Sequence, residues 1–455
     1  MIVALRHLAG LFAVGALLWF LWRRFDCDDR RTRWIVASGF LIRALPAEAL
    51  FWISYLRLPI LRPYQLGRGF WFFALDGTSY MSQASEVAAG GFFHVLVEGP
   101  PLVPNVYVRT LTAFVWLLGD SAAVGSLLNL LAYLGGALII ARWTSNRLPL
   151  IAISLAPAAI IWSLQPLKDA FFTFLMLLFF FVLWRFFVTH RWPYAIALMG
   201  VAAALASIRW YFGVILVSTA CVGLAVDALR PKFRPLHVVT SAAMVFAIAI
   251  AAALGAGDQV PMRLRPSSMI SAHLLRVGER TRDVAYTLEL VRDGFDATGG
   301  GTAIRPGRLI SRAPEPANTD YHLNYARMVA ESKPLPRGLV WSRLVTGVIV
   351  IIVPHAIANP IGLTDIGGGR GLWWLADTET LVFDAVAVLA LLAIIRAIRE
   401  RRLRNPLLWQ LTAMAVLLTL ALAYAVTNFG TLFRHRDMVF VALLGIVLSF
   451  ERGSG

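Results

Sequence analysis

The sequence predicts an all-α polytopic membrane protein with about eleven transmembrane helices, short juxtamembrane helices and one large extracytoplasmic loop. Two observations lead to this fold class. Of the 455 residues, 58% are hydrophobic and 12% are aromatic, well above the values of a soluble domain. The formal net charge of +16 comes from arginines that flank apolar runs, as the positive-inside rule describes. Because the charge follows topology, no nucleic-acid partner is expected.

The predicted transmembrane helices are apolar segments close to the roughly 20 residues that a membrane crossing needs. They are residues 2–22, 34–57, 121–141, 148–163, 167–187, 193–208, 211–228, 236–256, 376–397, 406–427 and 437–450. The first segment lacks a clear small-residue cleavage site, so we expect it to remain as an anchor.

Four basic clusters are expected on the cytoplasmic side of the membrane. They occupy residues 23–33, 142–147, 229–235 and 396–404. This orientation requires that two further apolar runs, Val103 to Leu118 and Leu339 to Pro360, do not cross the bilayer. We predict both as interfacial or re-entrant helices on the opposite side. The alternative is that one run crosses and one basic cluster is misplaced.

The predicted topology divides the chain into three parts. Residues 1–256 form an N-terminal transmembrane module whose first outer loop is 58–120. Residues 257–338 form a polar extracytoplasmic region, and a loop of this length in a membrane enzyme often shapes the specificity for an acceptor. Residues 339–455 hold an interfacial helix and the C-terminal transmembrane helices.

The stretch FFALDGTSYMSQASEVAAGG, from Phe72 to Gly91, places Asp76 before a short amphipathic helix that carries Tyr80. By default such an acid is a helix N-cap or a turn residue, which stabilises first-turn amides by about 1 kcal/mol. The order of the surrounding elements favours a function. An apolar helix containing Arg43 comes before it, and EGPPLVP with a second apolar helix comes after it.

Further polar groups are predicted on the same outer side as Asp76. PLKDAFF carries Lys168 and Asp169, which also fit a helix cap with a neighbouring ion pair. SIRWYFG carries Arg209, and TNFGTLFRHRDMVF carries Arg434 and Arg436. Guanidinium groups offer planar, paired donors to phosphate. Aromatic packing of Arg209 and headgroup anchoring by the Arg-His-Arg triplet are the alternatives.

Arg43 lies inside a predicted transmembrane helix, where an ionisable side chain is a functional candidate by default. We interpret it as either an architectural residue or a contact of a lipid phosphate.

The succession of elements around Asp76 resembles the first outer loop of the GT-C glycosyltransferases. These polytopic enzymes use polyprenyl-phosphate sugars and include protein mannosyltransferases and the aminoarabinose transferase of lipid A. In that superfamily the first outer loop carries an acidic residue, proposed as a general base or metal partner, which Asp76 matches by position. Asp169 matches a second acidic position in the next outer loop. The sequence departs from the family where DGT replaces its common paired acids.

The resemblance implies a glycosyltransferase of a bacterial-type cytoplasmic membrane, with its active site facing outward. It would transfer sugar from a polyprenyl-phosphate or polyprenyl-pyrophosphate donor to a lipid, glycan or protein acceptor. Asp76 and Asp169 would be catalytic and could hold a divalent cation, Mg²⁺ or Mn²⁺. The residues that would contact the substrate or its lipid phosphate are Lys168, Arg209, Arg434, Arg436, Tyr80 and Arg43.

Two other functions remain open at this point. A lipid-linked oligosaccharide polymerase or ligase would use the same arginine chemistry with a glycan acceptor. A flippase or transporter belongs to a different class, for which an internal repeat is expected. The sequence shows no such duplication.

Overall fold

A computed structural model describes the helical part of the chain. The described residues are 29–91, 106–229, 235–256, 347–349, 351–358, 373–400, 405–425 and 429–452, with isolated positions 5, 8, 9, 12, 15, 16 and 345. The predicted anchor 2–22, apart from those isolated positions, and the predicted loop 257–338 lie outside this part.

The described chain is mostly helical, which confirms the all-α prediction. A short antiparallel hairpin, β1 (Gln65–Gly67) with β2 (Phe70–Trp71), and the 3₁₀ turns Arg62–Tyr64 and Phe72–Ala74 are the exceptions. The helices are α2 (Arg30–Tyr55), α3 (Leu75–Ala89), α5 (Val106–Leu118), α6 (Ala122–Trp143), α7 (Leu148–Leu155), α8 (Pro157–Ile161), α9 (Asp169–Thr189), α10 (Trp192–Ile208), α11 (Trp210–Ala228), α12 (Pro235–Ala256), α18 (His355–Ala358), α19 (Trp373–Arg399), α20 (Pro406–Ala425) and α21 (Phe429–Arg452).

Within the described residues, six helices are long and apolar enough to cross a membrane: α2, α6, α9, α11, α19 and α20. The protein is therefore a multi-pass membrane protein. Eleven crossings were predicted, and those beyond these six stay predictions. Helix α10 has 17 residues, at the short end of what a crossing needs, and the segment 148–163 is interrupted between α7 and α8.

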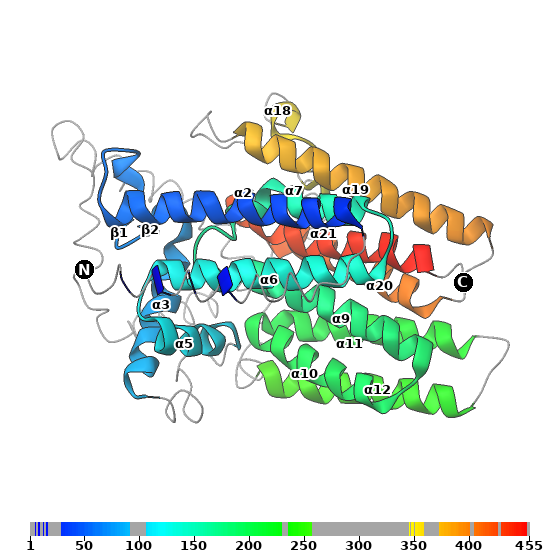
Figure 1. The fold of residues 1–455 in the computed structure, drawn as a ribbon. Helices are drawn as coiled ribbons and strands as arrows, with labels where there is room; N and C mark the ends of the chain where they lie inside the picture. Colours follow the sequence, from blue (N-terminus) through cyan, green and yellow to red (C-terminus); the bar gives the residue numbers. More distant parts are fainter. Residues whose placement is uncertain are drawn as a thin grey trace, which may run out of the picture.

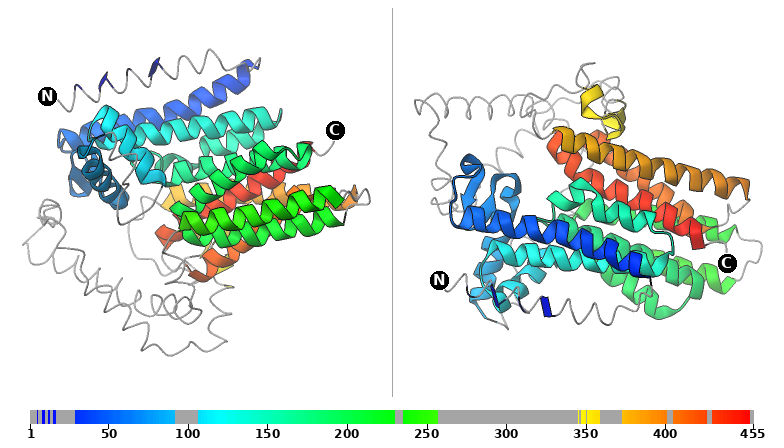
Figure 2. Two further views of the ribbon diagram at one scale, coloured as in Figure 1. Left: turned by 90° about the horizontal axis from the view of Figure 1, so that it is seen from below. Right: turned by 45° about the horizontal axis from the view of Figure 1, so that its top comes forward.

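The long helices run side by side in a bundle with two different ends (Figure 1). The β-hairpin, α3 and α5 gather at one end, here called the hairpin end, and two further views show the same arrangement (Figure 2). At the opposite end, the basic end, α2 begins at Arg30 and α19 finishes at Arg399. The α6–α7 connection joins this end, because Arg147 forms a 2.7 Å ion pair with Asp29.

Helix α5 stays at the hairpin end and does not cross the bundle. Its 13 residues span about 20 Å at 1.5 Å per residue, less than the roughly 30 Å of a bilayer core. The Val106 N–H donates to Ser207 Oγ, at 3.2 Å, near the end of α10. The other end of α5 leads directly to Ser121, the N-cap of α6. Both ends therefore lie beside the same end of the bundle.

The helix predicted over 148–163 is broken at Pro157. Proline has no N–H to donate to the carbonyl of Ile153, and the Ala158 N–H donates instead to Glu379 Oε2, at 3.0 Å. The freed carbonyls of Ile153 and Ser154 accept hydrogen bonds from Arg43, at 2.9 and 2.7 Å. Since an unsatisfied backbone group inside a membrane is costly, Arg43 and Glu379 make this break stable.

Helix α9 carries the centre of the core and so places its first residue at the centre of the hairpin end. It packs against α6, α10, α20 and α21. Its buried aromatic residues include Phe172, Phe179, Phe180 and Phe186. The residue that begins this central helix is Asp169.

Candidate functional site

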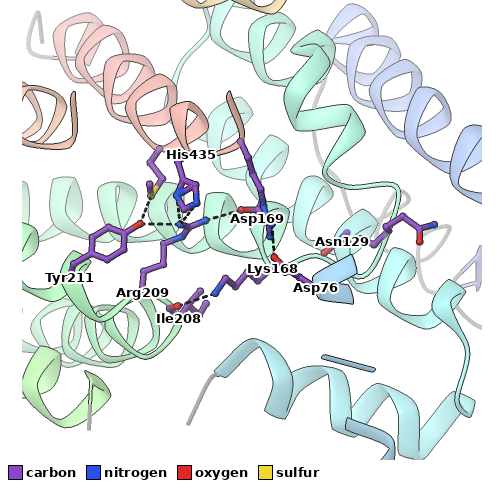
Figure 3. Close-up of polar contacts among 11 residues, drawn as sticks. Asp76, Asn129, Lys168, Asp169, Ile208, Arg209, Tyr211 and His435 are labelled. Carbon is purple, nitrogen blue, oxygen red and sulfur yellow. Dashed lines mark hydrogen bonds and ion pairs between the residues drawn. The ribbon is translucent and has the colours of Figure 1, made fainter. Parts of the chain in front are cut away.

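Two arginines from distant parts of the chain meet on the carboxylate of Asp169. Arg209, between α10 and α11, donates from Nη2 to Oδ1 at 2.8 Å. Arg434, on α21, donates from Nε to Oδ2 at 2.7 Å. The Asp169 side chain is 4% exposed, so each of its oxygens has a charged donor in a buried setting; Figure 3 shows the contact with Arg209. Charge-assisted bonds of this kind are the strong ones.

Arg434 also reaches Asp76. Its Nη1 donates to Asp76 Oδ2 at 2.7 Å. The Asp76 side chain is 54% exposed and that of Arg434 is 16% exposed, so the guanidinium joins a buried carboxylate to an accessible one. Asp76 lies in the first turn of α3, whose N-cap is Ala74. Its carboxylate therefore forms a contact between helices. It is not the helix N-cap, the alternative that the sequence had allowed.

Lys168 and Tyr80 lie beside these ion pairs. Lys168 Nζ lies 5.6 Å from the centre of the Tyr80 ring, and it donates to the carbonyl of Ile208 at 3.5 Å, the limit of a hydrogen bond. Burial, with the charge of Arg209, lowers the pKa of Lys168 to about 8. Burial, with the carboxylate of Asp76, raises the pKa of Tyr80 to about 12. Both shifts follow from charges placed in a poorly solvated site.

Three residues that were not proposed from the sequence orient the two arginines. Arg209 Nη1 donates to Tyr211 OH at 2.9 Å and contacts the ring of His435. A ring nitrogen that faces a guanidinium must accept, so His435 is neutral here and adds no charge. The guanidinium of Arg434 lies 5.7 Å from the Trp162 ring centre. His435 and Tyr211 could have been suspected from the sequence, because they lie beside the proposed arginines in RHRD and SIRWYFG. No neighbouring motif indicated Trp162.

Two residues predicted to contact phosphate lie elsewhere. Arg436 is 3% exposed and donates to the carbonyl of Ile351 and to Thr380 Oγ1. Two residues along a helix turn the side chain by about 200°, so Arg436 faces away from Arg434. Arg43 is committed to the break between α7 and α8. The structure therefore brings neither residue to Asp169.

The five residues Asp76, Lys168, Asp169, Arg209 and Arg434 form what we call the arginine–carboxylate cluster. It holds three cationic groups and two carboxylates, and it is accessible on the side of Asp76. A surplus of positive charge in a desolvated setting favours a bound anion. Arg209 Nε is buried and has no hydrogen-bond partner among the described residues.

The cluster fits a divalent cation poorly. Mg²⁺ and similar ions take about six oxygen ligands, whereas Asp76 and Asp169 share one guanidinium and have Lys168 and Arg209 beside them. No group of three or more His, Cys, Asp or Glu suited to a metal occurs within the described ranges.

No known family matches the chain, and no curated protein or solved structure matches it. The fold itself defines the class, an α-helical multi-pass membrane protein. The chain carries the arginine–carboxylate cluster at one end of its helical bundle.

Proposed function

We propose that the protein is a GT-C-type membrane glycosyltransferase. It transfers a sugar from a polyprenyl-phosphate or polyprenyl-pyrophosphate donor to a lipid, glycan or protein acceptor, at the outer face of a bacterial-type cytoplasmic membrane. The observation that carries the proposal is the bridge that Arg434 makes between Asp169 and the accessible Asp76. The resemblance in the order of elements around Asp76 supports the same activity.

Lys168, Arg209 and Arg434 are the proposed phosphate contacts. As the bond between the anomeric carbon and the phosphate oxygen breaks, negative charge develops on the departing phosphate. Preorganised cations in a site of low dielectric stabilise that charge more in the transition state than in the ground state. Asp169 takes no part in bond making in this scheme, because both of its oxygens hold the arginines in place.

Asp76 is the proposed partner of the acceptor. Its carboxylate orients the acceptor hydroxyl, and it takes the proton late, as the new bond forms between the hydroxyl oxygen and the anomeric carbon. In the structure Arg434 donates a hydrogen bond to the Asp76 carboxylate. We expect the donor phosphate to draw Arg434 away, so that the acid becomes available when the donor is bound.

The test is transfer of radiolabelled sugar from a mixed pool of polyprenyl-linked donors by purified protein. Asp76→Asn should abolish transfer at an unchanged melting temperature, since Asp76 makes its contact at an exposed position. Glu86→Gln is the matched control, because Glu86 is an exposed acid further along α3 and should keep full activity. Equal transfer by wild type and Asp76→Asn would remove Asp76 from the mechanism.

A lipid-linked oligosaccharide polymerase or ligase would use the same cluster and differ in its acceptor. A transporter of an anionic substrate is the second candidate, favoured by the discontinuous helix α7–α8, because transporters often bind substrates at such breaks. Proteoliposomes separate the classes. A transferase releases polyprenyl phosphate or polyprenyl pyrophosphate, according to the donor, whereas a transporter moves the labelled lipid between leaflets and leaves the sugar bond intact.

A further inference from the structure

Three residues beyond Arg434, α21 buries an acid, Asp437, that is not part of the arginine–carboxylate cluster. Asp437 is 7% exposed, and its Oδ1 has no hydrogen-bond partner among the described residues. None of the ion pairs of the arginine–carboxylate cluster involves it. An ionisable side chain in such a position is a functional candidate in a membrane protein.

Asp437 lines a small cavity inside the bundle. The cavity measures about 20 Å³, and its polar and aromatic lining consists of Arg43, Tyr133, Trp162, Thr173, Phe174 and Asp437. No residue of the arginine–carboxylate cluster lines it. The rest of the lining is apolar, but the volume admits about one water molecule beside these polar side chains. The acid therefore has space for a proton-exchange partner on one side.

The cations near Asp437 are directed at other groups. Arg43, from α2, donates to the carbonyls of Gly39, Ile153 and Ser154. On α21 itself, Arg436 donates to the carbonyl of Ile351 and to Thr380.

The remaining charged groups near Asp437 make their hydrogen bonds and ion pairs with other residues. Glu379, from α19, is a second buried carboxyl and accepts from the Ala158 N–H. On the side of α9, Asp169 and Arg209 are paired with each other. Helix α20 also packs against α21 but contains no charged residue.

An ionised Asp437 would thus be a desolvated charge with an unmet acceptor, next to another acid. Protonation removes the charge and leaves a neutral carboxyl that the cavity accommodates. We propose that Asp437 is a proton-binding site in the interior of the bundle, separate from the arginine–carboxylate cluster. Its release of the proton would place a carboxylate opposite Arg43, whose donors hold the break between α7 and α8. This proposal does not depend on whether the protein transfers sugars.

Labelling with N,N′-dicyclohexylcarbodiimide tests the proposal, because this apolar reagent adds to protonated carboxyl groups in apolar surroundings. The full-length protein in lipid nanodiscs is treated at a series of pH values, digested and analysed by mass spectrometry. We expect an adduct at Asp437 that falls about tenfold per pH unit above its midpoint, as the protonated fraction does. Asp169 is the internal control: it is equally buried but paired with two arginines, so it should stay unmodified.

Infrared spectroscopy provides a second reading that does not depend on access of the reagent. The carbonyl band of a protonated carboxylic acid should be present in the wild type and reduced in Asp437→Asn, while Glu86→Gln leaves it unchanged. A reduced band in Asp437→Asn supports the site even where the adduct is weak. The proposal is overturned if Asp437→Asn leaves the band intact, or if Asp437 and Asp169 are labelled equally at every pH.

Discussion

Arg434 donates through Nε to the buried carboxylate of Asp169 at 2.7 Å, while the rest of its guanidinium points toward the accessible side of the bundle. This contact fixes the plane of the guanidinium, because the fork of an arginine is rigid. The Nη1 atom is thereby aimed at Asp76, at 2.7 Å. One buried acid thus sets the direction in which an arginine can meet a ligand or a second acid.

Arg434→Lys should lower transfer by about 10²-fold or more, the usual cost of losing one preorganised donor. Lysine keeps the charge, but it cannot bond Asp169 and Asp76 in the fixed geometry of a guanidinium. Initial rates with the polyprenyl-linked donor measure the effect. Arg436→Lys is the matched control on the same helix, since Arg436 faces Thr380 and Ile351. A rate loss confined to Arg436→Lys would reverse the assignment.

Arg43→Met should destabilise the protein without changing the donor KM of the folded fraction. It would leave the carbonyls of Ile153 and Ser154 without donors, at about 1–3 kcal/mol for each buried group. The melting temperature in detergent should therefore fall clearly. An unchanged melting temperature together with a raised donor KM would restore the earlier alternative that Arg43 contacts phosphate.

Lys168 should make donor binding depend on pH. Burial and Arg209 lower the pKa of Lys168 to about 8, so the ammonium group loses its proton as pH rises through this value and the attraction for phosphate weakens. The donor KM should rise between about pH 7 and pH 9. Lys168→Arg should remove this rise, because arginine stays charged. A KM that rises equally in both proteins would assign the dependence to another group.

The same shift has a defined consequence for stability. The folded pKa of about 8 lies below the ordinary value of 10.5, so between these two values the unfolded chain binds the proton more readily than the folded protein does. Unfolding free energy should therefore rise with pH in this window. Lys168→Met should flatten that rise in thermal melts, whereas a slope unchanged by the substitution would show that Lys168 does not cause it.

Much of the site was predictable because topology groups polar residues by side. Asp76, Lys168, Asp169, Arg209 and Arg434 were all expected on one face from the alternation of basic clusters, and the structure gathers them at the hairpin end. The local sequence did not show that Asp169 would be bound by both Arg209 and Arg434. That depends on how α3, α9 and α21 meet, which is a property of packing.

The placement of Arg43 and Arg436 was harder to obtain from sequence. Pro157 lay inside a predicted transmembrane helix and could have signalled a break. Arg43 lies more than 100 residues away in sequence, so the sequence did not show that it would donate to the freed carbonyls. For Arg436 the helical turn of about 100° per residue already separates it from Arg434. The count of crossings was less predictable, because an apolar run of 16 or 17 residues fits both a crossing and a shorter buried helix.

Two exposed serines should report opposite sides of the membrane. Ser79 lies on α3 at the hairpin end, and Ser145 lies between α6 and α7 at the basic end. Helix α6 separates the two ends with 22 residues, about 33 Å at 1.5 Å per residue, and α5 does not cross back.

Single cysteines at these positions, in a chain with Cys27 and Cys221 changed to serine, are treated with an impermeant maleimide in sealed, right-side-out vesicles. We expect Ser79→Cys to label and Ser145→Cys to label only after detergent is added. Labelling of both from the outside would mean that the two ends of the bundle do not face opposite sides, and would remove the basis for an outward-facing cluster.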